Sequence, residues 1–128
     1  MLASSDFTGN TTWEIGVSNP RLTERTKFIA TFSLSNKAVA TSGDYVHHFS
    51  SDFSQHHIIN PHSGFSPTEL SSVTVIASSA TEADALSTAL MVLGIQDGLA
   101  FVEKLSGVEA LFATKDQVLY RSIGFPAI

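Results

Sequence analysis

The chain has 128 residues, of which 43% are hydrophobic and 15% charged, and its formal net charge is −5. This length predicts one domain with enough apolar residues for a buried core, unlike a disordered chain. The net charge argues against nucleic acid as a partner, because phosphate backbones attract clustered Lys and Arg. The lack of cysteine excludes disulfides, thiolate metal sites and cysteine nucleophiles. We expect no membrane span, since no apolar run reaches the ~18 residues required, and no signal peptide at Met1.

Strands are predicted over the first part of the chain. They share alternating or β-branched apolar residues bounded by turn residues, and they cover residues 12–18, 27–35, 36–40, 55–59 and 70–78. The last of these is the strongest, because Val73, Val75 and Ala77 lie opposite Thr74 and Ile76. Residues 1–10 are polar and are expected to form a loop or tail.

Two helices and a hairpin are predicted to follow. The first helix covers residues 82–93, with Thr81 as its N-cap and Gly94 after its end, and the second covers residues 97–105. Residues 108–114 and 118–123 then form a hairpin. Strands dominate, so residues 1–128 are predicted to form one α+β domain: a mostly antiparallel sheet with two adjacent helices.

Asp84 and Thr88 lie four residues apart and therefore share one helical face. One interpretation is that Asp84 belongs to a capping box and Thr88 bonds back to the helix. The other is a site for a hard cation, because Mg²⁺ binds one or two protein carboxylates together with ligand phosphates and waters. The helix N-terminus would also favour phosphate.

Two more polar blocks precede this helix. Residues 41–44 read Thr-Ser-Gly-Asp, which is either an ordinary turn or one whose glycine lets a phosphate approach the backbone. Five histidines fall between positions 47 and 62. Adjacent histidines point to opposite faces of a strand and do not chelate, so one of His56 and His57 must face inward, as a core residue or as a general base. Residues 60–67 form a rigid loop, either a connection or a preorganised ligand loop.

Together these blocks resemble the ApbE family, the FAD:protein FMN transferases. The resemblance lies in the order and spacing of matching segments, namely residues 13–17, 40–45, 56–64, 70–77, 83–90, 92–94, 98–99 and 110–112. Each segment alone is common, but the joint match runs through most of the chain. It covers roughly the C-terminal half of the family pattern.

The resemblance implies a reaction and roles for particular residues. Such enzymes use Mg²⁺ to split the pyrophosphate of FAD, attach FMN to a Thr or Ser of a target protein and release AMP. Asp84 and Thr88 would be the magnesium ligands, and His57 the base that activates the acceptor hydroxyl. The residues expected to line the FAD site are Thr41, Ser42, Gly43, Ile58, Asn60, Pro61, Ser63 and Gly64.

The sequence departs from the family at two places. Asn60-Pro61 stands where Asp-Pro is usual, and His62-Ser63-Gly64 stands where a basic residue, Thr and Gly are usual. These departures remove one negative and one positive charge, so we expect a different affinity for pyrophosphate or a different selectivity for FAD. The family's N-terminal half, with a glycine-rich segment and a backbone metal ligand, has no counterpart here.

The resemblance also implies partners. The acceptor would be a flavoprotein, such as a subunit of a redox pump. The apolar face left open by the missing half favours a homo-oligomer or a complementing N-terminal half chain. The family is often extracytoplasmic and membrane-associated. A non-catalytic FAD- or nucleotide-binding module and an assembly protein of the same fold are the alternatives to an enzyme.

Overall fold

The structure is a computed structural model that describes residues 12–22 and 27–128, so the tail expected at residues 1–10 lies outside the described residues. The elements are β1 (Trp13–Ser18), β2 (Phe28–Leu34), β3 (Ala38–Gly43), β4 (Leu70–Ala77), α1 (Ala80–Val102), β5 (Glu109–Thr114) and β6 (Leu119–Arg121). All paired strands run antiparallel. The predicted α+β class is therefore confirmed.

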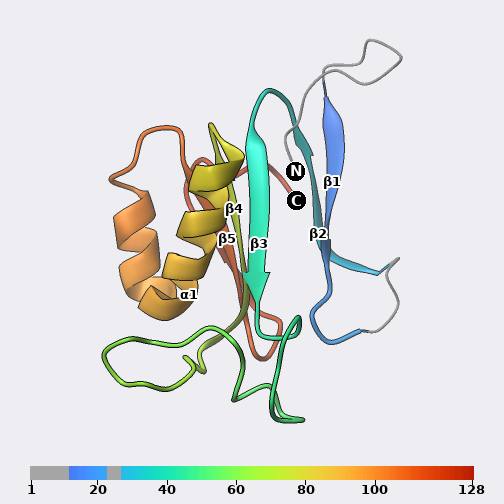
Figure 1. Cartoon of the computed structure of the whole chain (residues 1–128). Helices are drawn as coiled ribbons and strands as arrows, with labels where there is room; N and C mark the ends of the chain where they lie inside the picture. Colours follow the sequence, from blue (N-terminus) through green and yellow to red (C-terminus); the bar gives the residue numbers. More distant parts are fainter. Residues whose placement is uncertain (1–11, 23–26) are drawn as a thin grey trace.

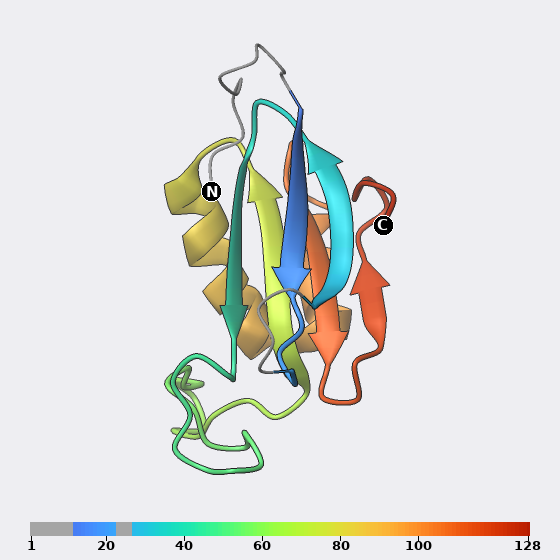
Figure 2. The same cartoon turned by 90° about the vertical axis from the view of Figure 1, so that its right-hand side faces the viewer.

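The molecule has three layers, with the central sheet between α1 and the β1–β2 pair (Figure 1). The central sheet has the strand order β3-β4-β5-β6. Figure 2 shows the β1–β2 pair lying over the face of this sheet that α1 does not cover. A long segment without regular strands, residues 44–69, joins β3 to β4 at one end of the sheet.

Strand β4 lies at the centre of the packing, because all eight of its residues are buried. Val73, Val75 and Ala77 belong to the core beneath α1, whereas Ile76 belongs to the core beneath β1 and β2. The predicted alternation is correct, and it places apolar side chains on both faces of a central strand. Two cores on one sheet fix the positions of the elements that carry the candidate site.

Helix α1 differs from the prediction at both ends. Its N-cap is Ser79 and not Thr81, since the Ser79 side chain accepts a hydrogen bond from the Glu82 backbone N–H at 3.2 Å. This is the Ser-x-x-Glu pattern of a capping box, beginning two residues earlier than predicted. Regular helix ends at Val102, so residues 103–105 are not helical.

The two predicted helices form one element with a sharp bend (Figure 1). Gly94 lies inside α1 with φ 82° and ψ −177°, a conformation open almost only to glycine. A Cβ at this position would lie 2.2 Å from Oε2 of Glu69. Gly94 therefore does end the first helical arm, as predicted, and a second arm begins directly after it.

Two strand predictions need correction. Residues 41–43 do not form a turn, because β3 continues to Gly43 and pairs with β4 along its whole length. Residues 55–59 do not form a strand, since their only ladder contact among the described residues is an isolated bridge between His48 and His56. The terminal hairpin forms as predicted, although β6 is short.

By length and composition alone, α1 is apolar enough to cross a membrane, which the sequence analysis did not expect. A core helix of a soluble protein passes the same test. Here the helix bends at Gly94 and contributes Ala83, Leu90 and Met91 to the core over the sheet. Only 33% of the apolar stretch is buried in the structure, so packing on the sheet accounts for part of its apolar character.

Candidate functional site

The first arm of α1 brings Asp84 and Thr88 together with β3. Both residues are exposed. The Ser42 hydroxyl lies 2.9 Å from the Thr88 hydroxyl and 2.7 Å from that of Ser87. The Asp84 carboxylate has no hydrogen-bond or ion-pair partner among the described residues. We call Ser42, Asp84 and Thr88 the metal-ligand half of the candidate site.

The oxygen atoms of this half fit a hard cation. Mg²⁺ favours a carboxylate, with ligand phosphates and waters completing its octahedron. Within residues 12–22 and 27–128, no three His, Asp or Glu side chains are grouped so as to hold a metal by themselves. A magnesium ion on Asp84 and Thr88 would therefore take its remaining ligands from substrate, water or another part of the protein.

Thr41 and Gly43 lie on the face of β3 opposite to that of Ser42, because side chains alternate along a strand. The Thr41 hydroxyl lies 2.8 Å from that of Thr74, across the β3–β4 pair. A Cβ on Gly43 would meet the Tyr45 ring at 2.3 Å and the Ser71 carbonyl oxygen at 3.1 Å. Glycine at position 43 therefore leaves room for the Tyr45 ring. The predicted turn would have required glycine for a different reason, its backbone conformation.

His57 is the outward member of the histidine pair. Its backbone N–H and its Nδ1 both approach the carbonyl oxygen of His47, at 3.0 and 3.2 Å. A carbonyl oxygen only accepts, so Nδ1 carries the hydrogen and Nε2 holds a free lone pair. The His47 ring packs edge-on against the His57 ring, with centroids 5.4 Å apart. An exposed, oriented imidazole of this kind can accept a proton at Nε2.

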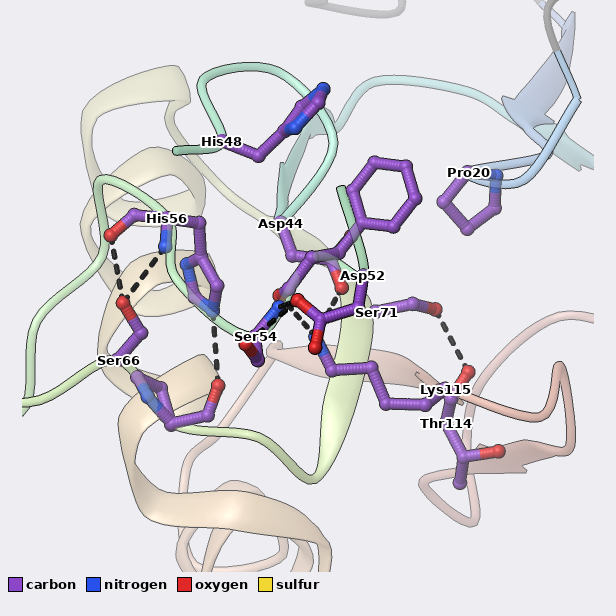
Figure 3. Close-up of polar contacts among 12 residues, drawn as sticks. Pro20, Asp44, His48, Asp52, Ser54, His56, Ser66, Ser71, Thr114 and Lys115 are labelled. Atoms are coloured by element: carbon purple, nitrogen blue, oxygen red, sulfur yellow. Dashed lines mark hydrogen bonds and ion pairs between the residues drawn. The ribbon is translucent and has the colours of Figure 1, made fainter. Parts of the chain in front are cut away.

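His56 is the inward member of the pair, and an inward histidine was expected here. It is fully buried; its backbone N–H donates to the Ser66 hydroxyl at 2.9 Å, and its Nε2 donates to the Pro67 carbonyl at 3.0 Å (Figure 3). Its Nδ1 has no partner among the described residues. Burial lowers the pKa of His56 below its ordinary value. These contacts make His56 an anchor of the loop.

The loop after His57 is closed by its own backbone. The Asn60 N–H donates to the Phe65 carbonyl at 2.9 Å, and the Gly64 N–H donates to the Asn60 carbonyl at 2.8 Å. The side chains of Asn60 and Ser63 also accept backbone hydrogen bonds within the loop. Pro61, Ser63 and Gly64 are exposed, and Ile58 is buried in the main core. We call His57 and residues 60–64 the histidine half.

No hydrogen bond between described residues joins the histidine half to the metal-ligand half. Beside the loop lies a hollow of about 220 Å³ lined by Phe49, Gln55, His56, Ile59, Gly64, Phe65 and Ser66. Phe49 and Phe65 are largely exposed, at 75% and 76%. The predicted site residues therefore lie in two separate clusters, the metal-ligand half and the histidine half.

A buried carboxylate directly after β3 was not among the site residues predicted from the sequence. Asp44 is fully buried and forms ion pairs with Arg21 and Lys115. Figure 3 shows Asp44 and Lys115. These partners are 23 and 71 residues away in sequence. No local pattern encodes such pairs, although Asp44 follows directly on the predicted Thr-Ser-Gly segment.

Comparison with known proteins defines the class. The ApbE family model matches residues 2–112, and the chain belongs to the ApbE family. The computed fold is similar to the ApbE protein of Thermotoga maritima (TM-score 0.80, 37% identity, 94% of this chain and 38% of that one). It is also similar to the flavin transferase ApbE of Vibrio cholerae (TM-score 0.73, 32% identity, 95% and 39%).

Two curated relatives of this chain have the same name. The protein from Treponema pallidum is 38% identical over 114 residues and is named an FAD:protein FMN transferase, as is that from Klebsiella pneumoniae, which is 34% identical over 107 residues. The matches cover 88% and 82% of this chain but only 31% and 34% of those proteins. The chain therefore spans about a third of the length of these relatives, and the resemblance predicted from its motifs is confirmed.

Proposed function

We propose that this chain carries the histidine and metal-ligand part of an FAD:protein FMN transferase. The reaction is the magnesium-dependent transfer of FMN from FAD to a Thr or Ser hydroxyl of a target protein, with release of AMP. The names of the relatives support flavin transfer in general. The motif order supports the particular roles of His57, Asp84 and Thr88.

The observation that carries the proposal is the state of His57. Its ring is exposed, its Nδ1 donates to the His47 carbonyl, and its Nε2 has no partner among the described residues. A general base needs a lone pair within reach of the hydroxyl it deprotonates. His56 cannot fill this role in the observed fold, because its ring is buried and its Nε2 is occupied by Pro67.

The proposed reaction is a nucleophilic substitution at the FMN phosphorus of FAD. The acceptor oxygen attacks the FMN phosphorus of FAD, and its proton moves to Nε2 of His57. The bond from that phosphorus to the bridging oxygen breaks, so AMP leaves with this oxygen and FMN becomes a phosphoester of the acceptor. Positioning of the two reactants supplies much of the remaining rate, since oriented reactions gain large effective molarities.

Asp84 and Thr88 would hold Mg²⁺, with the Ser42 hydroxyl beside them. When bound, the ion would neutralise charge on the pyrophosphate oxygens. The half-buried Ser42 offers a hydroxyl to a phosphate, and the closed loop at Asn60, Pro61, Ser63 and Gly64 would border the site. Thr41 points to the opposite face of β3, where its hydroxyl meets that of Thr74, so it would reach the ligand only through its backbone. Gly43 and Ile58 would support this site through the core.

The partner in this proposal is the acceptor flavoprotein, with a redox-pump subunit as one example. Since the chain spans about a third of its relatives, a second copy or a chain supplying the remaining part would complete the FAD site. The same coverage favours a second candidate function, a non-catalytic FAD- or nucleotide-binding module.

The test is to titrate FAD into the protein with and without Mg²⁺ while following flavin fluorescence and AMP release. Magnesium-dependent binding with AMP release supports the transferase. Binding without AMP release, also in the presence of acceptor proteins and of the remaining family segment, would favour the binding module. No binding under either condition would contradict both.

A further inference from the structure

The cluster of the buried Asp44 with the half-buried Arg21 and Lys115, here called the Asp44 clamp, links segments that are far apart in sequence. Arg21 donates two hydrogen bonds to the Asp44 carboxylate, at 2.8 and 2.7 Å, and the Lys115 ammonium donates to Oδ2 of Asp44. Arg21 follows β1, Asp44 follows β3, and Lys115 follows β5. The ends of these three strands meet at the same end of the molecule (Figures 1 and 2). The clamp therefore joins the β1–β2 layer to the central sheet.

The clamp also holds the tip of an irregular hairpin, residues 47–57. Lys115 Nζ donates to the Phe53 carbonyl at 2.8 Å, and the Arg21 guanidinium lies 4.2 Å from the centroid of the Phe53 ring. Phe53 itself has a positive φ of 61°, which is unusual for a bulky residue. Two cations of the clamp thus fix one residue at the hairpin tip.

The other end of this hairpin carries the candidate base. The Phe49 N–H donates to the Gln55 carbonyl at 2.7 Å, and the His57 N–H donates to the His47 carbonyl at 3.0 Å. These bonds transmit the position of the tip to His47, whose carbonyl oxygen also accepts from Nδ1 of His57. The tautomer of His57 therefore depends on a carbonyl oxygen that only this hairpin places.

We propose that Lys115, with Asp44 and Arg21, is a positioning residue for the flavin-transfer step: it fixes hairpin 47–57 so that His57 keeps Nδ1 protonated and presents Nε2. This inference rests on the proposed function of His57. The hairpin lies within 26 residues that contain no regular strand or helix (44–69). A segment of that length needs tertiary anchors to hold a fixed shape. Ion pairs with one buried carboxylate are suited to this, since their geometry is specific even where their net stabilisation is small.

The test compares Lys115→Met with Arg121→Met. Each substitution removes a cation that donates to a backbone carbonyl, that of Phe53 for Lys115 and that of Pro126, at 3.1 Å, for Arg121. Only the first carbonyl belongs to the hairpin. Asp44 keeps Arg21 as its partner in both variants, so we expect the fold to be retained. Lys115→Gln, which keeps a donor without a charge, is the conservative variant.

Two readouts need no substrate. In Lys115→Met, exchange of the Phe49 and His57 amide hydrogens is expected to accelerate by about tenfold or more, because the hairpin opens locally. The nitrogen chemical shifts of His57 are expected to move from one tautomer toward a mixture of both. Arg121→Met is expected to change neither, and Lys115→Gln is expected to restore part of the wild-type behaviour.

The catalytic readout is the split between kcat and KM. Lys115→Met is expected to lower kcat for FMN transfer about 10- to 100-fold, the size of loss that follows displacement of a catalytic group by ~1 Å. KM for FAD is expected to change less than about twofold, since no FAD contact is removed. Unchanged exchange rates and an unchanged His57 tautomer in Lys115→Met would overturn the inference. A wild-type protein that transfers no FMN would instead overturn the proposed function, and the exchange and tautomer data would still decide whether the clamp positions His57.

Discussion

The two halves of the candidate site are held in place by different means. Asp84 and Thr88 lie on one face of a regular helix whose other face is buried against the sheet, so their spacing follows from helix geometry. His57 lies in a segment without regular structure, and its position follows from hydrogen bonds to other loop backbone and from the Asp44 clamp. The Asp84–Thr88 pair is local in sequence, whereas the position of His57 depends on tertiary contacts.

This difference predicts how each half responds to mutation. Removing the Asp84 side chain would remove a proposed metal ligand but leave the scaffold intact, since its carboxylate has no partner among the described residues. Removing an anchor from the histidine half shifts groups that are themselves unchanged. Four substitutions test this contrast, beginning with the largest expected effect.

His57→Ala is expected to lower the rate of FMN transfer by about 10² to 10⁴-fold, because a general base contributes by that factor. FAD affinity is expected to remain, since the imidazole is proposed to act on the acceptor hydroxyl and not on FAD. The measurements are FMN attached to the acceptor and FAD binding followed by flavin fluorescence. His62→Ala removes another exposed histidine five positions on and is expected to alter KM at most. Equal loss of kcat in both variants would show that the histidine half has no particular base.

Asp84→Ala is expected to abolish the magnesium dependence and to lower transfer by about 100-fold or more, because a bound cation stabilises transition-state charge by several kcal/mol. The unfolding midpoint in urea is expected to stay within experimental scatter, as the carboxylate is exposed. Asp97→Ala removes an exposed carboxylate from the second arm of α1 and serves as the control. Magnesium-dependent activity that survives in Asp84→Ala would refute the metal assignment.

The contrast between the halves also explains what sequence could predict. The i, i+4 spacing of Asp84 and Thr88 is a property of any helix, so the pair was predictable once residues 82–93 were recognised as helical. The contact of Thr88 with Ser42 was not, because it requires β3 to extend through Ser42 and to pack against α1. The turn predicted at residues 41–43 was wrong for this reason. A short polar segment with a glycine has the composition of a turn, but pairing with β4 overrides that preference.

The histidine half shows the opposite balance. One of His56 and His57 does face inward as predicted, although the strand on which that prediction was based does not form. The sequence could not show which carbonyls receive their hydrogen bonds, since His47 and Pro67 lie about ten residues away in irregular backbone. The ion pairs of Asp44 span still larger separations, and no local pattern contains them. Site chemistry that depends on loops is thus visible in sequence as residue types, while its geometry is not.

Gly94→Ala tests the scaffold of the metal-ligand half. The expected loss is about 1–3 kcal/mol in the free energy of unfolding, because the backbone conformation at Gly94 is essentially closed to other residues. The contact of the new Cβ with Glu69, 2.2 Å away in the present geometry, adds to this loss. Gly64→Ala is the matched control: its φ is also positive, at 76°, but a Cβ there meets nothing within 4 Å. If urea unfolding gave equal losses of stability for Gly94→Ala and Gly64→Ala, contact with Glu69 would not contribute to the loss at position 94.

The smallest expected effect is the pH dependence contributed by His56. Burial lowers its pKa below the ordinary value of 6.5, so the unfolded chain binds a proton at higher pH than the folded chain does. The contribution of His56 to the free energy of unfolding should therefore be fully present above pH 6.5. It should decrease as the pH falls from there toward the pKa of the folded state. His56→Gln should flatten this slope between pH 7.5 and 5.5 in urea unfolding, whereas His62→Gln, at an exposed position, should leave it unchanged. A slope that persists in His56→Gln would mean that protonation of another group loosens the histidine half, and the anchor role of His56 would then rest on its hydrogen bonds to Ser66 and Pro67 alone.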